Sequence, residues 1–195
     1  MEHLMDTDLV KMAQRGEAQA FDILVQRYQT RVTGLVYRYV QNTDTALDLV
    51  QDIFLKVYRN LTNFKGESKF SSWLFRVAAN DCIDHLRKMK VRKEQSLDHY
   101  QDSGFDVADS SKDADTASSY EVLDERRRVR RALSDLPDNQ KTVVVMKVYQ
   151  EMTFDEIADV LQEPVSTVKS RLYKALNSLG GIMRQQSFIE KRGKI

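Results

Sequence analysis

The sequence predicts an all-α protein made of two small helical domains. Residues that interrupt helices are scarce, with 7 glycines and 2 prolines among 195 residues. Apolar residues recur at intervals of three and four along most of the chain, which is the period of an amphipathic helix. Over residues 96–119 this period stops, and six aspartates accompany many serines and one lysine. Such a composition predicts a flexible acidic linker between a domain at 1–95 and a domain at 120–195.

Composition limits the classes of protein that the chain can form. The formal net charge is +1, so nucleic-acid binding would require local basic surfaces. The single Cys82 excludes an internal disulfide and fits a reducing cytosol. No apolar run approaches the roughly 20 residues of a membrane span. The first ten residues contain acids and lack a signal-peptide core. We therefore expect a soluble, cytoplasmic protein.

The first domain is predicted to contain four helices. The first is capped by Thr7 and closed by Gly16, and helices follow at about 17–40 and 44–61. Ser71 or Ser72 is expected to cap a fourth helix that runs to about residue 93. The third helix carries Asp48, Gln51 and Asp52 away from its apolar stripe. An apolar and acidic outer face suits a partner helix, and an ordinary solvated face explains it equally well.

The loop and helix over residues 64–93 combine aromatic and basic residues. Eight lysines and arginines stand against three acids, a local charge of +5. Phe64, Phe70 and Trp73 are interleaved with them. Bases of single-stranded nucleic acid stack on aromatic rings while cations track the backbone, so the pattern is typical of such a site. The alternative is an amphipathic helix whose basic end complements its dipole.

Residues 152–179 predict a helix-turn-helix. Thr153 and Glu156 have the spacing of a capping box. Residues 162–165 are long enough only for a turn, and Gly180-Gly181 is expected to end the second helix. Before this motif, the β-branched run at 143–148 favours a strand by propensity. We nevertheless expect a helix there, because no partner strand is evident in the neighbouring sequence.

The second helix of this motif has one apolar and one polar side. Its apolar stripe contains Val168, Leu172, Ala175, Leu176 and Leu179. The polar side contains hydrogen-bond donors and no acid, namely Ser166, Thr167, Lys169, Ser170, Arg171, Tyr173 and Lys174. In a DNA-binding helix-turn-helix the first four of these would approach base edges, and Arg171 and Lys174 would approach phosphates. An ordinary helical hairpin with a solvated basic face is the alternative.

These features together resemble a group 4 (extracytoplasmic function) bacterial RNA polymerase sigma factor of the sigma-70 family. The segments DLVQDIFLKVYRNL and FKGESKFSSWLFRVAANDCIDHLRK resemble sigma region 2, and LSDLPDNQKTVVVMKVYQEMTFDEIADVLQEPVSTVKSRLYKAL resembles region 4. The resemblance implies that Asp48, Gln51 and Asp52 dock on the β′ coiled coil of polymerase. It places −10 recognition, with one base flipped out, on Lys65, Ser68, Trp73, Arg76 and Asn80, with the basic Arg87 and Lys88 beyond them.

The same resemblance assigns −35 recognition to the polar side of the second helix, Ser166 to Lys174. Ser166 replaces a common glycine and Lys169 a common arginine, and lysine lacks the bidentate geometry of arginine. The implied function is a promoter-specificity subunit without catalytic activity. Its implied partners are RNA polymerase core (β′ coiled coil and β flap), promoter DNA and an anti-sigma factor. Because the two promoter elements lie about 50–60 Å apart, two modules on a long tether are expected.

Two other classes of function compete with this interpretation. A conventional helix-turn-helix regulator would bind its operator without polymerase. An enzyme acting on nucleic acid is disfavoured, because His3, His85 and His99 are scattered and Cys82 lies on an apolar face. No Cys/His cluster has zinc spacing and no phosphate-binding loop is present. We therefore expect no cofactor and no metal.

Overall fold

The computed structural model describes residues 3–97 and 127–192. Within these residues the chain is helical and contains no strand, which confirms the all-α prediction. The elements are α1 (Asp6–Gln14), α2 (Ala18–Val40), α3 (Thr43–Asn60), a 3-10 turn (Leu61–Asn63), α4 (Phe70–Leu97), a helical segment at 127–134, α6 (Asp138–Val144), a π-helical turn (Val145–Tyr149), α7 (Phe154–Leu161) and α8 (Val165–Arg192). The predicted linker falls almost entirely on residues 98–126, outside the described residues.

α2 is the centre of the first region and packs against α1, α3 and α4. Leu24, Val32 and Leu35 are fully buried along one side of it, as its apolar period requires. α2 ends where Gln41 adopts a left-handed conformation at φ 56°. The Asn42 side chain then accepts a hydrogen bond from the Thr45 amide and caps α3. The helix expected at about 44–61 is thereby confirmed, as α3 spans Thr43–Asn60.

Two predicted helix starts are wrong. α1 begins at Asp6 after Met5, which makes no side-chain cap, so Thr7 lies inside the first turn. α4 begins at Phe70, one residue before the proposed caps, and Ser72 is buried inside its first turn.

The predicted end of the second helix-turn-helix helix is also wrong. α8 continues through Gly180 and Gly181 to Arg192. Glycine ends a helix by adopting a left-handed φ, as Gly16 does at φ 94°. Within the described residues only Gly16 and Gly66 are glycines with a positive φ, so neither glycine of α8 acts as a stop. Leu176 was expected in the apolar stripe, but it is 45% exposed.

The β-branched run at 143–148 is helical, as predicted, but not regular. α6 ends at Val144 and a π-helical turn follows, in which the Gln150 amide donates to the Val145 carbonyl at 3.2 Å. Val143, Val144, Val145 and Met146 are all buried. Burial of this apolar run outweighs its preference for strand, because tertiary packing overrides a weak intrinsic propensity.

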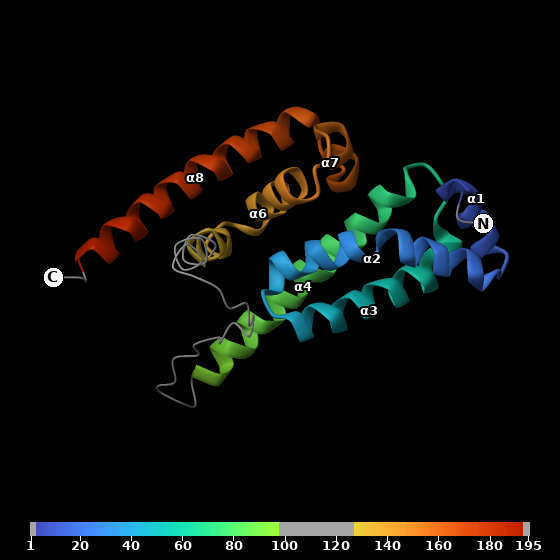
Figure 1. Ribbon diagram of the computed structural model, residues 1–195, viewed down its shortest axis with the longest axis horizontal. Coiled ribbons are helices and arrows are strands. Elements are labelled where there is room, and N and C mark those ends of the chain that lie inside the picture. Colours follow the sequence, from blue (N-terminus) through green and yellow to red (C-terminus); the bar gives the residue numbers. More distant parts are fainter. Residues whose placement is uncertain (1–2, 98–126, 193–195) are drawn as a thin grey trace, which may run out of the picture.

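The two helical regions pack against each other. One continuous cluster of buried apolar side chains includes residues of α2 and α4 as well as residues of α6, the π-helical turn, α7 and α8. Figure 1 shows α6 and α7 between α8 on one side and α2 and α4 on the other, with α3 on the side away from α8. The structure thus joins two modules that the sequence predicts to be separate and linked only by a tether. In the described part of the chain, no helix combines the length and apolarity needed to cross a bilayer.

Candidate polymerase and nucleic-acid interfaces

α3 presents the predicted polymerase-docking residues on one open face. Asp48, Gln51 and Asp52 are all exposed, and their spacing of three and four residues places them together along the helix. Leu47 and Leu55 on the same helix are 48% and 51% exposed. Burying each leucine in a complex would contribute about 1.5–3 kcal/mol. An acidic face with two exposed leucines therefore suits a helical partner that carries basic residues.

The loop before α4 is built on a cluster of three aromatic rings. The ring centroids of Phe64 and Trp73 lie 5.0 Å apart, and those of Phe70 and Trp73 lie 6.0 Å apart. Trp73 is therefore half-buried against its neighbours rather than free in solvent. Lys65 is exposed beside the cluster, and Ser68 is half-buried. A cation next to a partly open aromatic surface is an arrangement that can hold an unstacked base.

Gln14, at the end of α1, holds this loop in position. Its Nε2 donates to the carbonyl oxygen of Leu61 at 2.8 Å and to that of Phe64 at 2.9 Å. The start of α1 is anchored as well, because the Tyr28 hydroxyl donates to the Asp6 carboxylate. Burial, and then this hydrogen bond, raise the pKa of Tyr28, which keeps the hydroxyl protonated as the donor. α1 thus supports the loop, a role that the sequence pattern did not reveal.

Replacing Gln14 by methionine is expected to lower the free energy of unfolding by about 1–3 kcal/mol, since two hydrogen bonds worth roughly 0.5–1.5 kcal/mol each are lost. Urea denaturation measures the difference. Gln26→Met is the matched control, because Gln26 is exposed on α2. Equal unfolding free energies for the two variants would mean that Gln14 does not secure the loop.

The remaining predicted −10 residues on α4 differ in accessibility. Asn80, Arg87 and Lys88 are exposed, and Arg87 lies 3.8 Å from Asp84 in an open ion pair worth little. Arg76 is half-buried and donates hydrogen bonds to main-chain carbonyls at the end of α7. Among the predicted −10 residues, Arg76 is therefore engaged by region 4 in this structure.

α7 and α8 form the predicted helix-turn-helix. Thr153 Oγ1 accepts from the Glu156 amide at 3.2 Å, and the Glu156 carboxylate accepts from the Thr153 amide at 3.0 Å. This capping box was predicted and is confirmed. The hydrogen bond from the Thr153 backbone lowers the pKa of Glu156, which favours the charged, bonding form. Gln162 closes α7 at φ 54°, and α8 begins at Val165.

α8 buries one side and exposes the side predicted to read DNA. Val168, Leu172 and Ala175 are buried against the rest of the domain. Thr167 is half-buried, whereas the exposed members of the predicted set are Ser166, Lys169, Ser170, Tyr173 and Lys174. The exposed face therefore offers two ammonium groups, the Ser166 hydroxyl and one phenol as donors to base edges or phosphates, whereas the Ser170 hydroxyl donates to the Thr167 carbonyl at 3.0 Å.

Arg171, unlike most of the residues predicted to contact −35 DNA, is bound within the protein. Its Nη2 lies 2.7 and 2.9 Å from the two carboxylate oxygens of Glu163, and its side chain is only 19% exposed. Glu163 belongs to the turn and Arg171 to the second turn of α8, so the ion pair joins the two. The geometry supports a positioning role for Arg171, and its contact with phosphate stays a prediction.

Two of the contacts described above could have been predicted from local sequence, and those of Gln14 could not. Leu55 was expected off the apolar stripe of α3, but Leu47, eight residues before it and next to Asp48, was not, although its position in the sequence could have predicted its exposure. Glu163 and Arg171 have opposite charges on either side of a predicted turn, so their ion pair could also have been predicted. Gln14 bonds carbonyls 47 and 50 residues away, and no local pattern encodes that contact.

The single cysteine lies in the hydrophobic core. Cys82 is fully buried, which confirms its assignment to the core, and burial raises the pKa of its thiol to about 12. Where the chain is described, no group of three or more His, Cys, Asp or Glu side chains is placed to hold a metal ion.

Two parts of the chain match models of known protein families. The model of Sigma-70 region 2 matches residues 24–92, and that of Sigma-70 region 4 matches residues 126–179. The first match contains α3 and the aromatic loop, and the second contains the helix-turn-helix. Fold and surfaces together define a bacterial sigma factor.

Curated relatives and a solved structure agree with these matches. The chain is 35% identical over 176 residues to the RNA polymerase sigma-H factor of Pseudomonas aeruginosa, covering 89% of this chain and 91% of that one. It is also 35% identical over 176 residues to the ECF RNA polymerase sigma-E factor of Haemophilus influenzae, covering 89% and 93%. The sigma factor RpoE of Bartonella quintana, solved with the anti-sigma factor NepR, shares the fold with a TM-score of 0.62 at 20% identity, covering 84% of this chain and 96% of that one.

The chain belongs to the extracytoplasmic function (group 4) sigma factors of the sigma-70 family. It binds RNA polymerase core and directs promoter-specific initiation of transcription.

Proposed function

We propose a division of this activity among three surfaces. α3 docks on polymerase core through Asp48, Gln51 and Asp52. The aromatic loop and α4 bind the −10 strand, and the exposed face of α8 reads the −35 duplex. The domains are those expected from the sequence, region 2 at 1–95 and region 4 at 120–195, separated by the acidic linker. The chain has no catalytic activity of its own and works in the cytoplasm, where RNA polymerase works.

The observation that carries this proposal is the arrangement of α8. Its apolar stripe is buried, while hydroxyl and ammonium groups cover the opposite face without an exposed acid among residues 165–174. A helix of this kind enters the major groove as the second helix of the motif. Transcription by purified core polymerase on a promoter library, with and without this protein, tests the proposal. Transcripts that start at random positions in both samples would refute it.

We also propose that an anti-sigma protein holds this sigma factor inactive in cells. The proposal is supported by the solved relative in complex with an anti-sigma factor. An affinity-tagged chain recovered from unstressed cells is expected to bring down one further protein in place of polymerase. Recovery of polymerase alone under all growth conditions would argue against such a partner.

Asn80→Ala combined with Trp73→Ala is expected to impair opening of the −10 region more than recruitment of polymerase. Trp73 supplies part of the aromatic surface, and Asn80 is an exposed hydrogen-bonding group on α4. Loss of one stacked ring costs roughly 1–3 kcal/mol, which is about 5- to 150-fold in opening. Permanganate reactivity of −10 thymines measures opening, and a gel shift of the closed complex measures recruitment. Asn80→Ala alone separates the DNA contact from any loosening of the aromatic cluster.

A further inference from the structure

We propose that Gln14 is a positioning residue for the capture of a −10 base, because it holds the aromatic loop before α4 in the conformation that receives the base. Its side chain acts through main-chain carbonyls of the loop and does not itself contact DNA. This role rests on the proposed −10 function of the loop. It adds α1, to which that proposal assigns no part.

Gln14 bonds both sides of the short 3-10 turn that leads from α3 into the loop. Its Nε2 donates to the Leu61 carbonyl at 2.8 Å and to the Phe64 carbonyl at 2.9 Å, so both hydrogens of the amide are used. Leu61 is buried, and its carbonyl also accepts from the Phe64 amide at 3.1 Å. The main chain at Phe64 is thereby bonded both to the turn and to α1.

The main chain at Phe64 determines where the ring surface of the loop lies. The Phe64 ring centroid lies 5.0 Å from that of Trp73 and 6.1 Å from that of Phe70. Directly after Phe64 the loop becomes open. Gly66 and its two neighbours in the sequence are exposed, and Gly66 has φ 75°, a conformation that favours glycine. Gln14 therefore bonds the last point of the chain before this exposed part.

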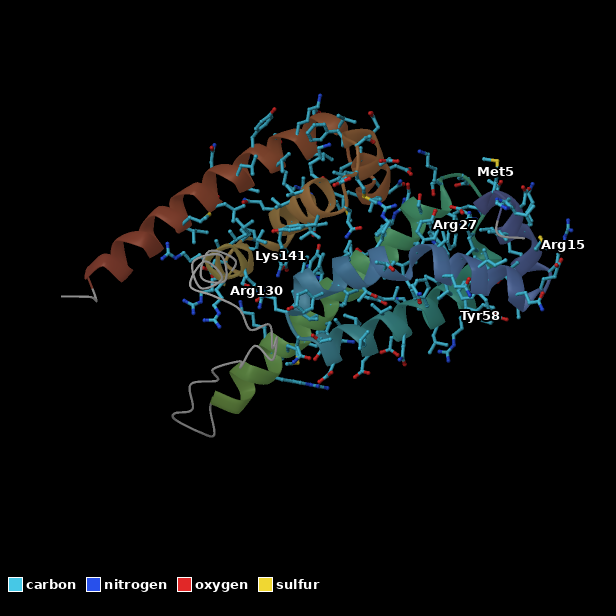
Figure 2. The ribbon with its side chains drawn as sticks, viewed as in Figure 1. Met5, Arg15, Arg27, Tyr58, Arg130 and Lys141 are labelled. Atoms are coloured by element: carbon cyan, nitrogen blue, oxygen red, sulfur yellow. The ribbon has the colours of Figure 1, made fainter. Side chains whose placement is uncertain are left out.

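The other end of α1 is anchored to the body of the domain. Asp6, in the first turn of α1, forms an ion pair with Arg27 of α2 and accepts from the Tyr28 hydroxyl. Arg27 also donates to the Leu4 carbonyl at 3.1 Å (Figure 2). The Tyr28 ring in turn packs edge-on against Phe70, with centroids 5.8 Å apart. α1 is thus bound to α2 at its start and to the loop at its end.

A loop that is held in this way captures a base at a smaller entropic cost. Ordering a loop only when the ligand binds reduces the free energy that binding releases. Apparent affinity therefore scales with the fraction of molecules whose loop is already competent. Loss of the Gln14 bonds lowers that fraction, but it leaves the proposed docking surface on α3 and the proposed −35 surface on α8 unchanged. We expect a defect in base capture without a defect in recruitment.

The test compares Gln14→Met with wild type as holoenzyme, and Gln26→Met is again the matched control. The DNA is a promoter selected by in vitro transcription, with its −10 region held open by mismatches. Abasic nucleotides replace the −10 bases one at a time, first on one strand and then on the other. We expect Gln14→Met to bind the intact DNA about 3- to 10-fold more weakly than wild type does. An abasic nucleotide at the captured position should remove this difference, because no base is left for the loop to hold.

The outcomes separate this role from a general loss of stability and from the proposed −10 function. If Gln14→Met weakens binding equally with and without the captured base, or weakens binding to the closed duplex promoter as much, the positioning role is overturned. It is also overturned if one abasic position weakens wild-type binding and Gln14→Met binds the intact DNA as tightly as wild type does. If no single abasic nucleotide weakens wild-type binding, the loop captures no base, and the proposed −10 function itself is wrong.

Discussion

Replacing both Asp48 and Asp52 by lysine is expected to reduce affinity for core polymerase about 100-fold or more, because losing one partner of a close interfacial charge pair costs roughly 2–5 kcal/mol. Both carboxylates are exposed on α3 and are expected to face basic residues of the β′ coiled coil. Reversal also places like charges together, which adds repulsion. Fluorescence anisotropy of the labelled sigma factor, titrated with core enzyme, measures the change.

The control for this charge reversal carries the same change in net charge elsewhere. Asp22 and Asp135 are exposed, the first on α2 and the second directly after the 127–134 helical segment, and neither belongs to α3. Asp22→Lys with Asp135→Lys is expected to bind core nearly as wild type does. If both double variants lose affinity equally, net charge rather than the α3 face controls docking, and the assignment of Asp48 and Asp52 fails.

The second large effect is expected on the exposed side of α8, where Lys169 is predicted to contact DNA and Arg171 to hold the helix in position. Lys169 is exposed, with its Nζ 5.4 Å from the Phe154 ring centroid. Lys169→Ala is expected to weaken binding of holoenzyme to a −35-dependent promoter about 10-fold. If Lys169 contacts a phosphate, the slope of log affinity against log salt should also fall by about 1. A salt titration on promoters with and without the −35 element measures both.

Arg171→Ala is expected to weaken the same binding by disturbing the turn, and Glu163→Gln tells the two explanations apart. If Arg171 positions α8, removing the charge of Glu163 loosens the turn and lowers −35 affinity, as Arg171→Ala does. If Arg171 instead binds a DNA phosphate, Glu163→Gln frees the guanidinium group of Arg171 and raises affinity for the −35 element. Higher affinity in Glu163→Gln would therefore overturn the positioning role.

The sequence was informative where local chemistry decides structure. The capping box at Thr153 and Glu156 and the burial of Val168, Leu172 and Ala175 on α8 follow from spacing within a few residues. Each is governed by helix geometry alone, so it could be predicted and was confirmed. The resemblance to sigma regions 2 and 4 rested on the same local motifs.

The sequence was uninformative where the partner is distant or is a main-chain group. Arg76 was predicted to contact DNA, yet its observed acceptors are carbonyls 83 and 84 residues away. Every residue carries a carbonyl, so no side-chain pattern marks these two. Gly180-Gly181 misled the prediction for a related reason. A glycine permits a helix to end, and only the packing around it determines whether the helix does so.

The acceptors of Arg76 have a consequence for genetics. Since they are main-chain oxygens, replacing the side chains of Asp159 or Val160 leaves both hydrogen bonds available. At Asp159, which is half-buried, the contact therefore places no demand on the side chain, whereas Val160 is constrained by its burial in the core. Substitutions that loosen the packing of the two regions are expected instead where a side chain itself makes the hydrogen bond, as Tyr39 does to Thr142 and Gln41 does to Ser134.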